Sequence, residues 1–409
     1  MITVGIDIGK GRHAVAVIDE AGKQIGKPAF YDNNLEGAEK LLAALAKLDS
    51  PSDTQIGMEA TGNYWFALHD HLAKAGYKIV VINPIVTSAS ISGDIRGRKS
   101  DKGDALVIAR VLLMGDAIPR QQPDTESRRL KALTRHRSFI VAQRTAMKKH
   151  LQSQLDVVFP EFHTLFEDMH STFAMELLRN YPTATALSKG KRPAIVKIVE
   201  RHTRGKDAAA EAERLIQAAK GSLGAESDVA DMFGLCIISA VESIRNMDAQ
   251  IKVIEDEILS FKMPKLAEII SQISGSGKLL PRVIAAEFGD ISRFEVDPKT
   301  GKKSGMHKRM LAFAGSEPRI RESGKWKGLI RMSKRGSGSL RTAGQQIAFT
   351  ISQNDSYFKA IYEKHINANK PHKVALSFVF AALLEVVCSL WKSGRKYTVE
   401  KPSAVKTAV

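Results

Sequence analysis

Acidic residues stand at regular places in the first quarter of the chain. Asp7 lies in the β-branched run Thr3-Val4-Gly5-Ile6-Asp7-Ile8, and Glu59 lies in a second short run, residues 55–60. In each run the acid follows a glycine by two residues, so in a strand the acid and the glycine share one face. A carboxylate inside an apolar strand is costly unless a cation or a hydrogen-bond donor meets it. The two runs therefore predict paired strand acids with a ligand.

A third acidic pair, Asp101 and Asp104, follows Ser100. Ser100 is a good N-cap, and acids three residues apart share one face of a helix start. Four carboxylates on two strands and one helix suit a two-metal phosphoryl-transfer site. The ligands would all be oxygen, with no set of Cys or His nearby, which favours Mg²⁺ or Mn²⁺ over zinc. Singly, each acid has a structural explanation, such as capping a turn, pairing with a lysine or favouring a helix N-terminus; the joint pattern predicts a metal site.

The elements that must position these acids alternate between strand and helix. Patterning predicts strands near residues 3–8, 13–19, 27–31, 55–60 and 78–83. A helix capped by Asn34 and a second helix beginning near Trp65 lie between them. The loop of residues 85–99 ends in Arg96, Arg98 and Lys99. The N-terminal part is therefore predicted to be an α/β domain with a mixed sheet covered by helices.

After Pro119 and Pro123 the pattern becomes helical, and we predict four parts of the chain. Residues 1–118 form the α/β metal-binding domain, and residues 119–263 form a helical and coiled-coil region for RNA binding and oligomerisation. Residues 264–392 form a mainly α domain, and residues 393–409 form a loose tail. A heptad seam in the second part indicates either an antiparallel helical hairpin or a dimerising coiled coil. The seam comprises Ile244, Met247, Ile251, Ile254, Ile258 and Phe261.

The first long helix of this region, over residues 128–150, is strongly basic. Locally scarce acids favour a phosphate-binding role over a merely solvated face, although both interpretations remain. Its predicted nucleic-acid-binding residues are Arg128, Arg129, Arg135, Arg137, Arg144, Lys148 and Lys149.

Composition points to a polyanionic partner. The 409 residues carry a formal net charge of +17 and a pI near 9.7, which is typical of nucleic-acid-binding proteins, although a basic enzyme without such a partner remains an alternative. Two cysteines are too few for a disulfide framework and suggest a reducing cytoplasm. No signal peptide pattern is present. The apolar run of residues 374–391 is expected to be a core helix rather than a membrane anchor.

Several of these motifs resemble one protein family. In the N-terminal part they are Gly5-Ile6-Asp7-Ile8, Glu59-Ala60-Thr61-Gly62, Val81-Ile82-Asn83-Pro84 and Asp101-x-x-Asp104-Ala105. In the C-terminal part they are Arg321-Glu322-Ser323-Gly324 and Arg331-Met332-Ser333-Lys334, followed by Ser339-Leu340-Arg341. Together they resemble the DEDD transposases of the insertion-sequence family numbered 110, also called bridge-RNA-guided recombinases. The resemblance implies a RuvC-type, ribonuclease H-like N-terminal domain and a C-terminal transposase domain.

The resemblance also implies a mechanism. Asp7, Glu59, Asp101 and Asp104 would be the DEDD quartet that holds the divalent metal. Ser323 is the best positional match for a serine that joins covalently to DNA. The competing serines in the same stretch are Ser333, Ser337 and Ser339, and Ser323 is otherwise a serine in a basic turn.

Further cations surround this serine in the sequence. Arg319, Arg321, Lys325 and Lys327 are predicted to hold phosphate oxygens. Arg331, Lys334, Arg335 and Arg341, with the loop cations Arg96, Arg98 and Lys99, complete the predicted nucleic-acid interface. The partners implied are donor and target double-stranded DNA, a structured noncoding guide RNA, and copies of the chain as a dimer that assembles to a tetramer. The expected location is the prokaryotic cytoplasm, in association with the nucleoid.

Two other functions remain open at this point. A metal-dependent junction-resolving endonuclease of RuvC type would hydrolyse DNA with water and leave Ser323 structural. A non-catalytic RNA- or DNA-binding protein would not need the acid quartet.

Overall fold

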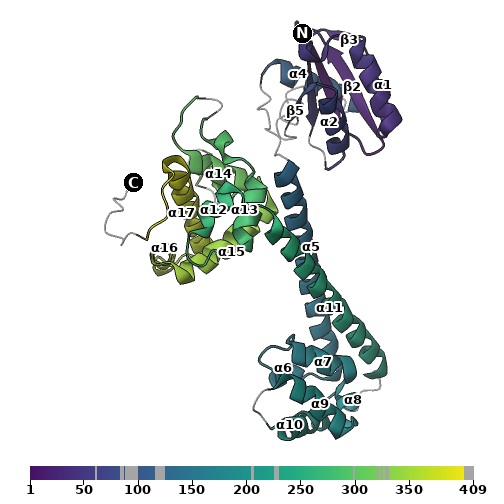
Figure 1. The fold of residues 1–409 in the computed structure, drawn as a ribbon, viewed down its shortest axis with the longest axis vertical. Coiled ribbons are helices and arrows are strands. Elements are labelled where there is room, and N and C mark those ends of the chain that lie inside the picture. The colour runs from purple at the N-terminus through teal and green to yellow at the C-terminus, as the bar shows by residue number, and fades with distance from the viewer. Residues whose placement is uncertain are drawn as a thin grey trace. The chain divides into compact units, whose positions relative to one another are not determined.

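A five-stranded sheet is the frame of the first unit of the chain, which comprises Met1–Gln122 and Pro298–Lys302. Its strands are β1 (Ile2–Asp7), β2 (Arg12–Ile18), β3 (Gln24–Asp32), β4 (Thr54–Glu59) and β5 (Lys78–Ile82), in the order β3-β2-β1-β4-β5. Figure 1 labels β2, β3 and β5 of this sheet. The first three strands form an antiparallel meander, and β4 and β5 run parallel to β1. This order and mixed sense are those of a ribonuclease H-like sheet, so the predicted fold class of the N-terminal part is confirmed.

The structure is a computed structural model. It describes residues 1–59, 62–82, 87, 100–115, 125–203, 207–224, 230–297, 300–319, 322–323, 326–327 and 331–399.

Helices cover both faces of the sheet because the strands alternate apolar residues toward each face. Ile6, Ile56 and Met58 face α1 (Leu35–Ala46) and α2 (Trp65–Lys74), and all three are fully buried. The short 3₁₀ helix η1 (Pro51–Asp53) leads into β4. The opposite face is covered by α4 (Asp101–Leu113), which packs on β5 and on the small residues of β2. The expected N-cap of α1 is present: Asn34 Oδ1 accepts a hydrogen bond from Gly37 N at 2.8 Å.

The second unit comprises Pro123–Asp297 and Lys303–Val409, and its two longest described helices pack together. These are α5 (Thr125–Val158) and α11 (Ala230–Ser260), which pack side by side. The two helices run in opposite directions, because Arg137 pairs with Glu255 whereas Arg144, further along α5, pairs with Asp248, which comes earlier in α11. The heptad seam therefore belongs to an antiparallel hairpin within one chain. Of the two readings left open by the sequence, the hairpin is the one observed.

Five short helices pack around one end of this hairpin. They are α6 (Phe162–Leu165), α7 (Thr172–Asn180), α8 (Ala184–Ser188), α9 (Arg192–His202) and α10 (Ala208–Lys220). Their apolar side chains surround Leu151 and Leu155 of α5 and Ile237 and Val241 of α11, which are fully or almost fully buried. This region has a core of its own.

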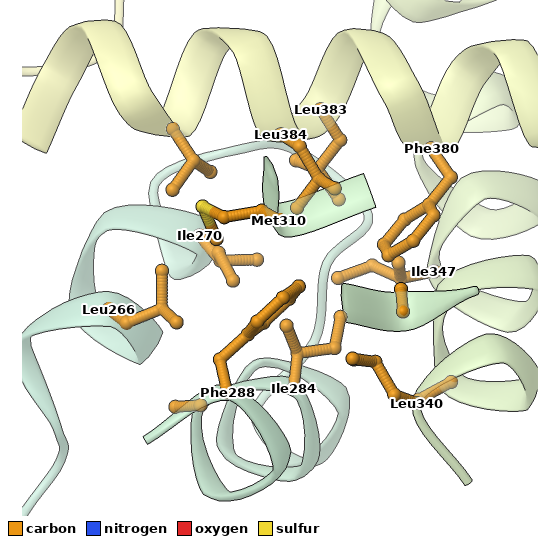
Figure 2. Packing of buried hydrophobic residues seen from close by; sticks show 14 of the residues in the cluster. Leu266, Ile270, Ile284, Phe288, Met310, Leu340, Ile347, Phe380, Leu383 and Leu384 are labelled. Atoms are coloured by element: carbon orange, nitrogen blue, oxygen red, sulfur yellow. The ribbon is translucent and has the colours of Figure 1, made fainter. Parts of the chain in front are cut away.

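The remaining helices form a second core at the other end. They are α12 (Lys265–Ser271), α13 (Leu279–Phe288), η2 (Ile291–Phe294), α14 (Met306–Ala314), α15 (Gly338–Asn354), α16 (Ser356–Asn367) and α17 (His372–Ser393). Figure 2 shows Ile284 and Phe288 of α13 meeting Met310 and Ile347 in this core. Leu130, Ile258 and Ala286 join α5, α11 and α13 in a smaller apolar cluster.

The apolar helix α17 is the one described helix that is long and apolar enough to cross a membrane by length and composition. Leu376, Phe380 and Leu384 lie on its buried side and form part of the C-terminal core. A core helix of a soluble protein passes the same length test, and the packing of α17 fits the predicted core helix.

Four strands of two residues each interrupt the helices of this second core. They are β6 (Pro318–Arg319), β7 (Glu322–Ser323), β8 (Trp326–Lys327) and β9 (Arg331–Met332). β6 pairs with β9, and β7 pairs with β8, both antiparallel. The C-terminal part is thus mainly helical, as predicted, with this nested pair of two-stranded ladders inserted between α14 and α15.

Candidate active site

The two strand acids lie at the same edge of the sheet. Asp7 ends β1 and Glu59 ends β4, and these strands are parallel neighbours in a register that pairs Ile6 with Met58. Parallel strands bring their carboxyl ends together, so residues 7 and 59 stand side by side. Both are partly exposed. Thr87, which is buried, donates its hydroxyl to Glu59 Oε2 at 2.7 Å.

Gly5 allows the helix that carries the third pair of acids to approach this edge. A Cβ atom on Gly5 would lie 2.0 Å from Ala105 O and 2.5 Å from Ala109 N, so only glycine lets α4 cross β1 at this distance. Gly57 in β4 is more tolerant, because a Cβ there would meet only side chains at 3.2–3.3 Å. Asp104 precedes Ala105 by one residue, and Asp7 follows Gly5 by two. Leu113, the last residue of α4, lies near Gly22 in the β2–β3 turn at the other end of the sheet, so the start of α4 lies at the end of β1 that carries Asp7.

The N-terminus of α4 is fixed by the predicted cap. Gly103 N donates to Ser100 Oγ at 3.2 Å, and Ser100 has extended backbone angles. The helix begins at Asp101 as expected, with Asp101 exposed and Asp104 partly exposed. Asp7, Glu59, Asp101 and Asp104 are thus brought to one sheet edge by elements that the sequence predicts.

The donors at this edge fit a hard divalent cation in their chemistry. All four are carboxylates, and oxygen donors suit Mg²⁺ or Mn²⁺. Within the described ranges, however, no three Asp, Glu, His or Cys side chains converge closely enough to hold a metal ion. Four carboxylates repel one another, and a cation is needed to draw them together. The structure therefore gives the backbone positions of the four predicted ligands, and their side chains do not form a coordination shell among the described residues.

A cavity of about 290 Å³ in the same unit lies away from these acids. It is lined by α1, α2 and the ends of β2 and β3, including His13, Asp32 and His71. Those helices cover the face opposite α4, and none of the four acids lines the cavity.

Ser323 lies in the inner of the two short ladders. In the β7–β8 pair, Ser323 is opposite Trp326 and Glu322 is opposite Lys327. The outer pair, β6–β9, closes the excursion of residues 318–332 at its base. We refer to residues 318–332 as the serine arm.

The foot of the serine arm is tied to α14 by backbone hydrogen bonds. Ser333 N donates to Glu317 O at 2.9 Å, and Lys334 N donates to Gly315 O at 3.0 Å. Gly315 has φ +68° and Lys334 has φ +55°, both in the left-handed region. A Cβ on Gly315 would also lie 2.8 Å from Arg335 N, which makes glycine the residue that fits there.

The predicted nucleic-acid cations of the serine arm and of the loop before α4 fall into four groups. Lys334 and Arg335 are exposed at its foot. Arg341 instead donates to Ala314 O at 3.2 Å and to Gly336 O at 2.8 Å, so it fastens the foot to α14. Arg319, Lys327 and Arg331 are described only as strand positions, whereas Arg96, Arg98, Lys99, Arg321 and Lys325 lie outside the described residues.

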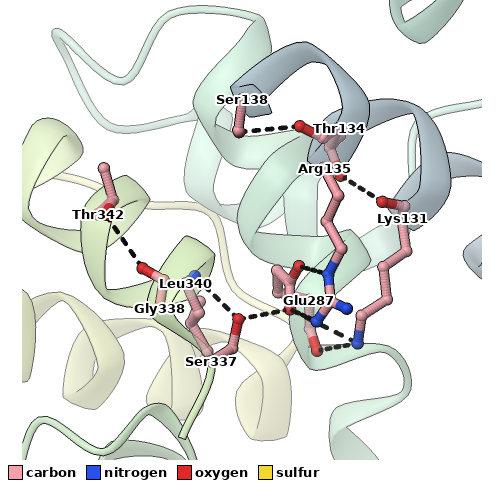
Figure 3. A network of polar contacts seen from close by, with 9 residues as sticks. All are labelled: Lys131, Thr134, Arg135, Ser138, Glu287, Ser337, Gly338, Leu340 and Thr342. Atoms are coloured by element: carbon pink, nitrogen blue, oxygen red, sulfur yellow. Dashed lines mark hydrogen bonds and ion pairs between the residues drawn. The ribbon is translucent and has the colours of Figure 1, made fainter. Parts of the chain in front are cut away.

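Several cations of α5 have partners that the local sequence does not reveal. Arg135 Nε lies 2.7 Å from Glu287 Oε1, and Lys131 Nζ lies 3.5 Å from Glu287 Oε2 (Figure 3). Arg137 pairs with Glu255, and Arg144 with Asp248. The premise that acids are scarce around this helix is therefore wrong in three dimensions, because α11 and α13 supply them. Arg129 and Lys149 are exposed, and Arg128 and Lys148 are half-buried.

Glu287 is the residue that sequence reasoning missed. It is 2% exposed in α13, among Pro281–Phe288, all of which are buried. Burial raises the pKa of its carboxyl, but the hydrogen bond from Arg135 and the charges of Lys131 and Arg135 outweigh burial, and the pKa lies below its usual value. A single acid within an apolar helical run was the available signal, since a buried carboxylate needs a partner.

Comparison with known proteins identifies the relatives of this chain. Residues 4–160 match a family model described as "Transposase", and residues 267–363 match one described as "Transposase IS116/IS110/IS902 family". The two models together match well over half of the chain and include the acidic edge and the serine arm.

Individual relatives agree with these family matches. The insertion element IS116 uncharacterized 44.8 kDa protein of Streptomyces clavuligerus is 25% identical over 98% of this chain and 97% of its own length. The insertion element IS900 uncharacterized 42 kDa protein of Mycobacterium paratuberculosis is 24% identical over 100% of this chain and 99% of its own. The mini-circle putative transposase for IS117 of Streptomyces coelicolor is 27% identical over 78% of this chain and 77% of its own.

Among solved structures, Thermus thermophilus RuvC is similar over 29% of this chain and 99% of its own length, at 17% identity and a TM-score of 0.23. The family models, the full-length relatives and the ribonuclease H-like sheet agree with one another, and the chain belongs to the IS116/IS110/IS902 family of transposases.

Proposed function

We propose that this transposase is an RNA-guided DNA recombinase that cleaves and rejoins donor and target DNA through a covalent link to Ser323. The observation that carries the proposal is the pairing of two features in one chain: four carboxylates at one sheet edge, and a serine in a short ladder whose flanking sequence is rich in Arg and Lys. A protein that only binds nucleic acid does not need the four carboxylates.

The acidic edge would hold Mg²⁺ or Mn²⁺ through Asp7, Glu59, Asp101 and Asp104. When bound, the cation would offset the charge that develops on the scissile phosphate. The hydrogen bond from Thr87 orients Glu59 toward this role, because it occupies one carboxylate oxygen and limits rotation of the group.

The proposed step at Ser323 is a transesterification. The serine oxygen attacks phosphorus and forms a new O–P bond, while the bond from phosphorus to the leaving deoxyribose oxygen breaks. The serine proton passes to solvent or a neighbouring base, and the leaving oxygen gains a proton. Attack by a strand-end hydroxyl on the phosphoserine reverses the step and rejoins DNA without loss of the phosphodiester energy.

The surroundings of the competing serines favour Ser323. Ser337 donates its hydroxyl to Glu287 at 2.9 Å and accepts a hydrogen bond from Leu340 N at 3.2 Å, so it is engaged as a helix cap. Ser333 Oγ accepts from Arg335 N at 3.4 Å at the foot of the arm. Ser323 is the serine in the inner ladder of the arm.

Denaturing electrophoresis of labelled DNA tests the nucleophile. With Mg²⁺, wild type is expected to give a shifted, protease-sensitive protein–DNA band. Ser323→Ala is expected to bind DNA and RNA but to lose the band, whereas Ser333→Ala and Ser339→Ala retain it. A band that persists in Ser323→Ala and disappears in Ser333→Ala or Ser339→Ala would assign the nucleophile elsewhere.

A hydrolytic endonuclease of RuvC type remains the second candidate. The observation in its favour is that all four acids lie within the first unit, so cleavage by water needs nothing from the serine arm. Strand cleavage by wild type without any covalent band would favour this alternative.

The guide RNA is a separate part of the proposal. The chain has a formal net charge of +17. Internal acids neutralise some arginines of α5, but exposed cations such as Arg129 and Lys149 remain for phosphates. Protein expressed with the DNA that flanks its reading frame is expected to copurify with one structured RNA, and ribonuclease treatment is expected to abolish site-specific cleavage. Unchanged site-specific cleavage after complete RNA removal would contradict guidance by RNA.

Assembly into a dimer and then a tetramer stays a prediction. The heptad seam that suggested it is used within the chain by α5 and α11, so an oligomer would need another surface. Sedimentation of the protein with and without RNA and DNA measures this directly.

A further inference from the structure

We propose that Glu287 is a positioning residue that links helix α5 to the foot of the serine arm and so sets the rate of the chemistry at Ser323. This inference rests on the proposed serine mechanism, and it adds a residue that neither the acid quartet nor the arm contains.

Glu287 lies at a junction of three elements. It projects from α13, is almost completely buried, and binds Arg135 and Lys131 of α5 and Ser337 at the start of α15 (Figure 3). Arg135 uses two nitrogens, Nε at 2.7 Å from Oε1 and Nη2 at 3.1 Å from Oε2. A bidentate pair of this kind fixes orientation as well as distance.

Both carboxylate oxygens of Glu287 accept hydrogen bonds. Oε1 accepts from Arg135 Nε, whereas Oε2 accepts from Arg135 Nη2 and from the Ser337 hydroxyl. A change in the position of Arg135 therefore moves the same group that holds Ser337. In many proteins a buried ion pair adds little net stability, so its presence is better explained by the orientation that it gives to its partners.

Ser337 lies close in the chain to the serine arm. Ser337 is the N-cap of α15, and only four residues separate it from β9, which closes the arm. Between them, Ser333 N and Lys334 N bind Glu317 O and Gly315 O on the other side of the foot. Arg341 fastens the same turn through Gly336 O and Ala314 O. The position of Ser337 therefore constrains where β9 ends, and β9 pairs with β6 at the base of the arm.

The other partner of Glu287 is Arg135 of α5. Arg135 lies on the basic helix predicted to contact nucleic acid, and its side chain is 51% exposed despite the ion pair. A phosphate that approaches α5 would compete with Glu287 for this guanidinium or draw it away. The network thus offers a direct physical route from occupancy of α5 to the foot of the serine arm.

The chain supplies a matched control on the same helix. Arg137 pairs with Glu255 on α11, and neither residue has a hydrogen bond or ion pair to Ser337 or to the described residues at the foot of the arm. Glu255→Gln therefore removes one carboxylate charge opposite α5, as Glu287→Gln does, without affecting the serine arm.

The experiment compares single-turnover rates of covalent adduct formation at saturating DNA and RNA with binding affinities. Glu287→Gln keeps the side-chain shape but loses the charge, and we expect the rate to fall at least 10-fold while DNA and RNA affinities change less than 3-fold. Glu255→Gln should change neither. Ser337→Ala should slow the reaction, and Ser337→Thr, which retains the hydroxyl, should restore most of the rate. Measurement well below each variant's unfolding temperature separates positioning from loss of fold.

Amide hydrogen exchange supplies a readout that does not depend on activity. Ser333 N–H, Lys334 N–H and Leu340 N–H are hydrogen-bonded at the foot and are expected to exchange faster in Glu287→Gln than in wild type or Glu255→Gln. Equal exchange at these amides, or an adduct rate in Glu287→Gln equal to wild type, would overturn the proposal. Failure of the serine mechanism is distinct: wild type itself would form no adduct, whereas the exchange comparison would still give its answer.

Discussion

The acidic edge and the serine arm are built in opposite ways. The edge rests on β1, β4 and α4, which are regular elements with buried apolar faces and a side-chain cap. The arm rests on four strands of two residues each, held at the foot by hydrogen bonds between backbone segments and by one buried carboxylate. The comparison teaches that the four predicted metal ligands stand on regular elements with fixed backbone positions, whereas the arm that carries the proposed nucleophile depends on long-range contacts.

The largest effect is expected from the acidic edge itself. Asp101→Asn removes one charge from the quartet without changing side-chain size, and it should lower strand cleavage by roughly 100- to 1,000-fold, because electrostatic stabilisation of the reacting phosphate is lost. Magnesium-dependent cleavage and RNA affinity are measured together. RNA binding should persist, and wild-type cleavage by the mutant would refute the role of Asp101 as a metal ligand.

The next effect tests how rigidly the edge is built. Gly5→Ala places a Cβ 2.0 Å from Ala105 O, so α4 must shift away from β1. Overpacking of this kind costs roughly 1–3 kcal/mol. Urea unfolding and strand cleavage should both be impaired, because the shifted helix carries Asp101 and Asp104.

Gly11→Ala is the matched control for that substitution. A Cβ on Gly11 would have no atom within 4 Å, so stability and cleavage should stay close to wild type. Equal behaviour of the Gly5 and Gly11 variants would mean that the approach of α4 to β1 is not what holds the edge.

The arm side of the comparison should show its dependence on charge in acid. Glu287 has a pKa below the ordinary value of 4.5, so its ion pair contributes stability above pH 4.5 that is lost as the pH falls through the lowered pKa. Wild type should therefore lose more stability between pH 5 and pH 3 than Glu287→Gln, which cannot titrate there. The measurement is the urea midpoint of the second unit's helical signal as a function of pH, and parallel curves for the two proteins would contradict the assignment.

The smallest effect separates two roles of cations on α5. Arg144→Ala removes a partly exposed pair with Asp248 and should cost about 0.2–1 kcal/mol of stability. Lys149→Ala, at an exposed position, should leave stability unchanged and lower the slope of log affinity for duplex DNA against log salt by about 0.9. An unchanged slope for Lys149→Ala would show that this part of α5 only faces solvent.

The sequence alone determined those parts of the protein in which the physical reason is local. Period-two alternation placed Asp7 with Gly5 and Glu59 with Gly57, and the cap at Ser100 placed the start of α4 at Asp101. Each of these assignments depends on residues within one turn or one strand. The same local patterns predicted a mixed sheet covered by helices, whereas its ribonuclease H-like type was implied by the family resemblance.

Only the tertiary structure decided the partners of α5 and the use of the heptad seam. Arg135 and Glu287 are 152 residues apart in the chain, Arg137 and Glu255 are 118 apart, and Arg144 and Asp248 are 104 apart. A heptad pattern specifies that an apolar seam will be buried, but it is equally satisfied by a helix of the same chain or of another. Likewise, an acid in an apolar helix signals that some cation must meet it, while the identity of that cation is set by how distant helices pack.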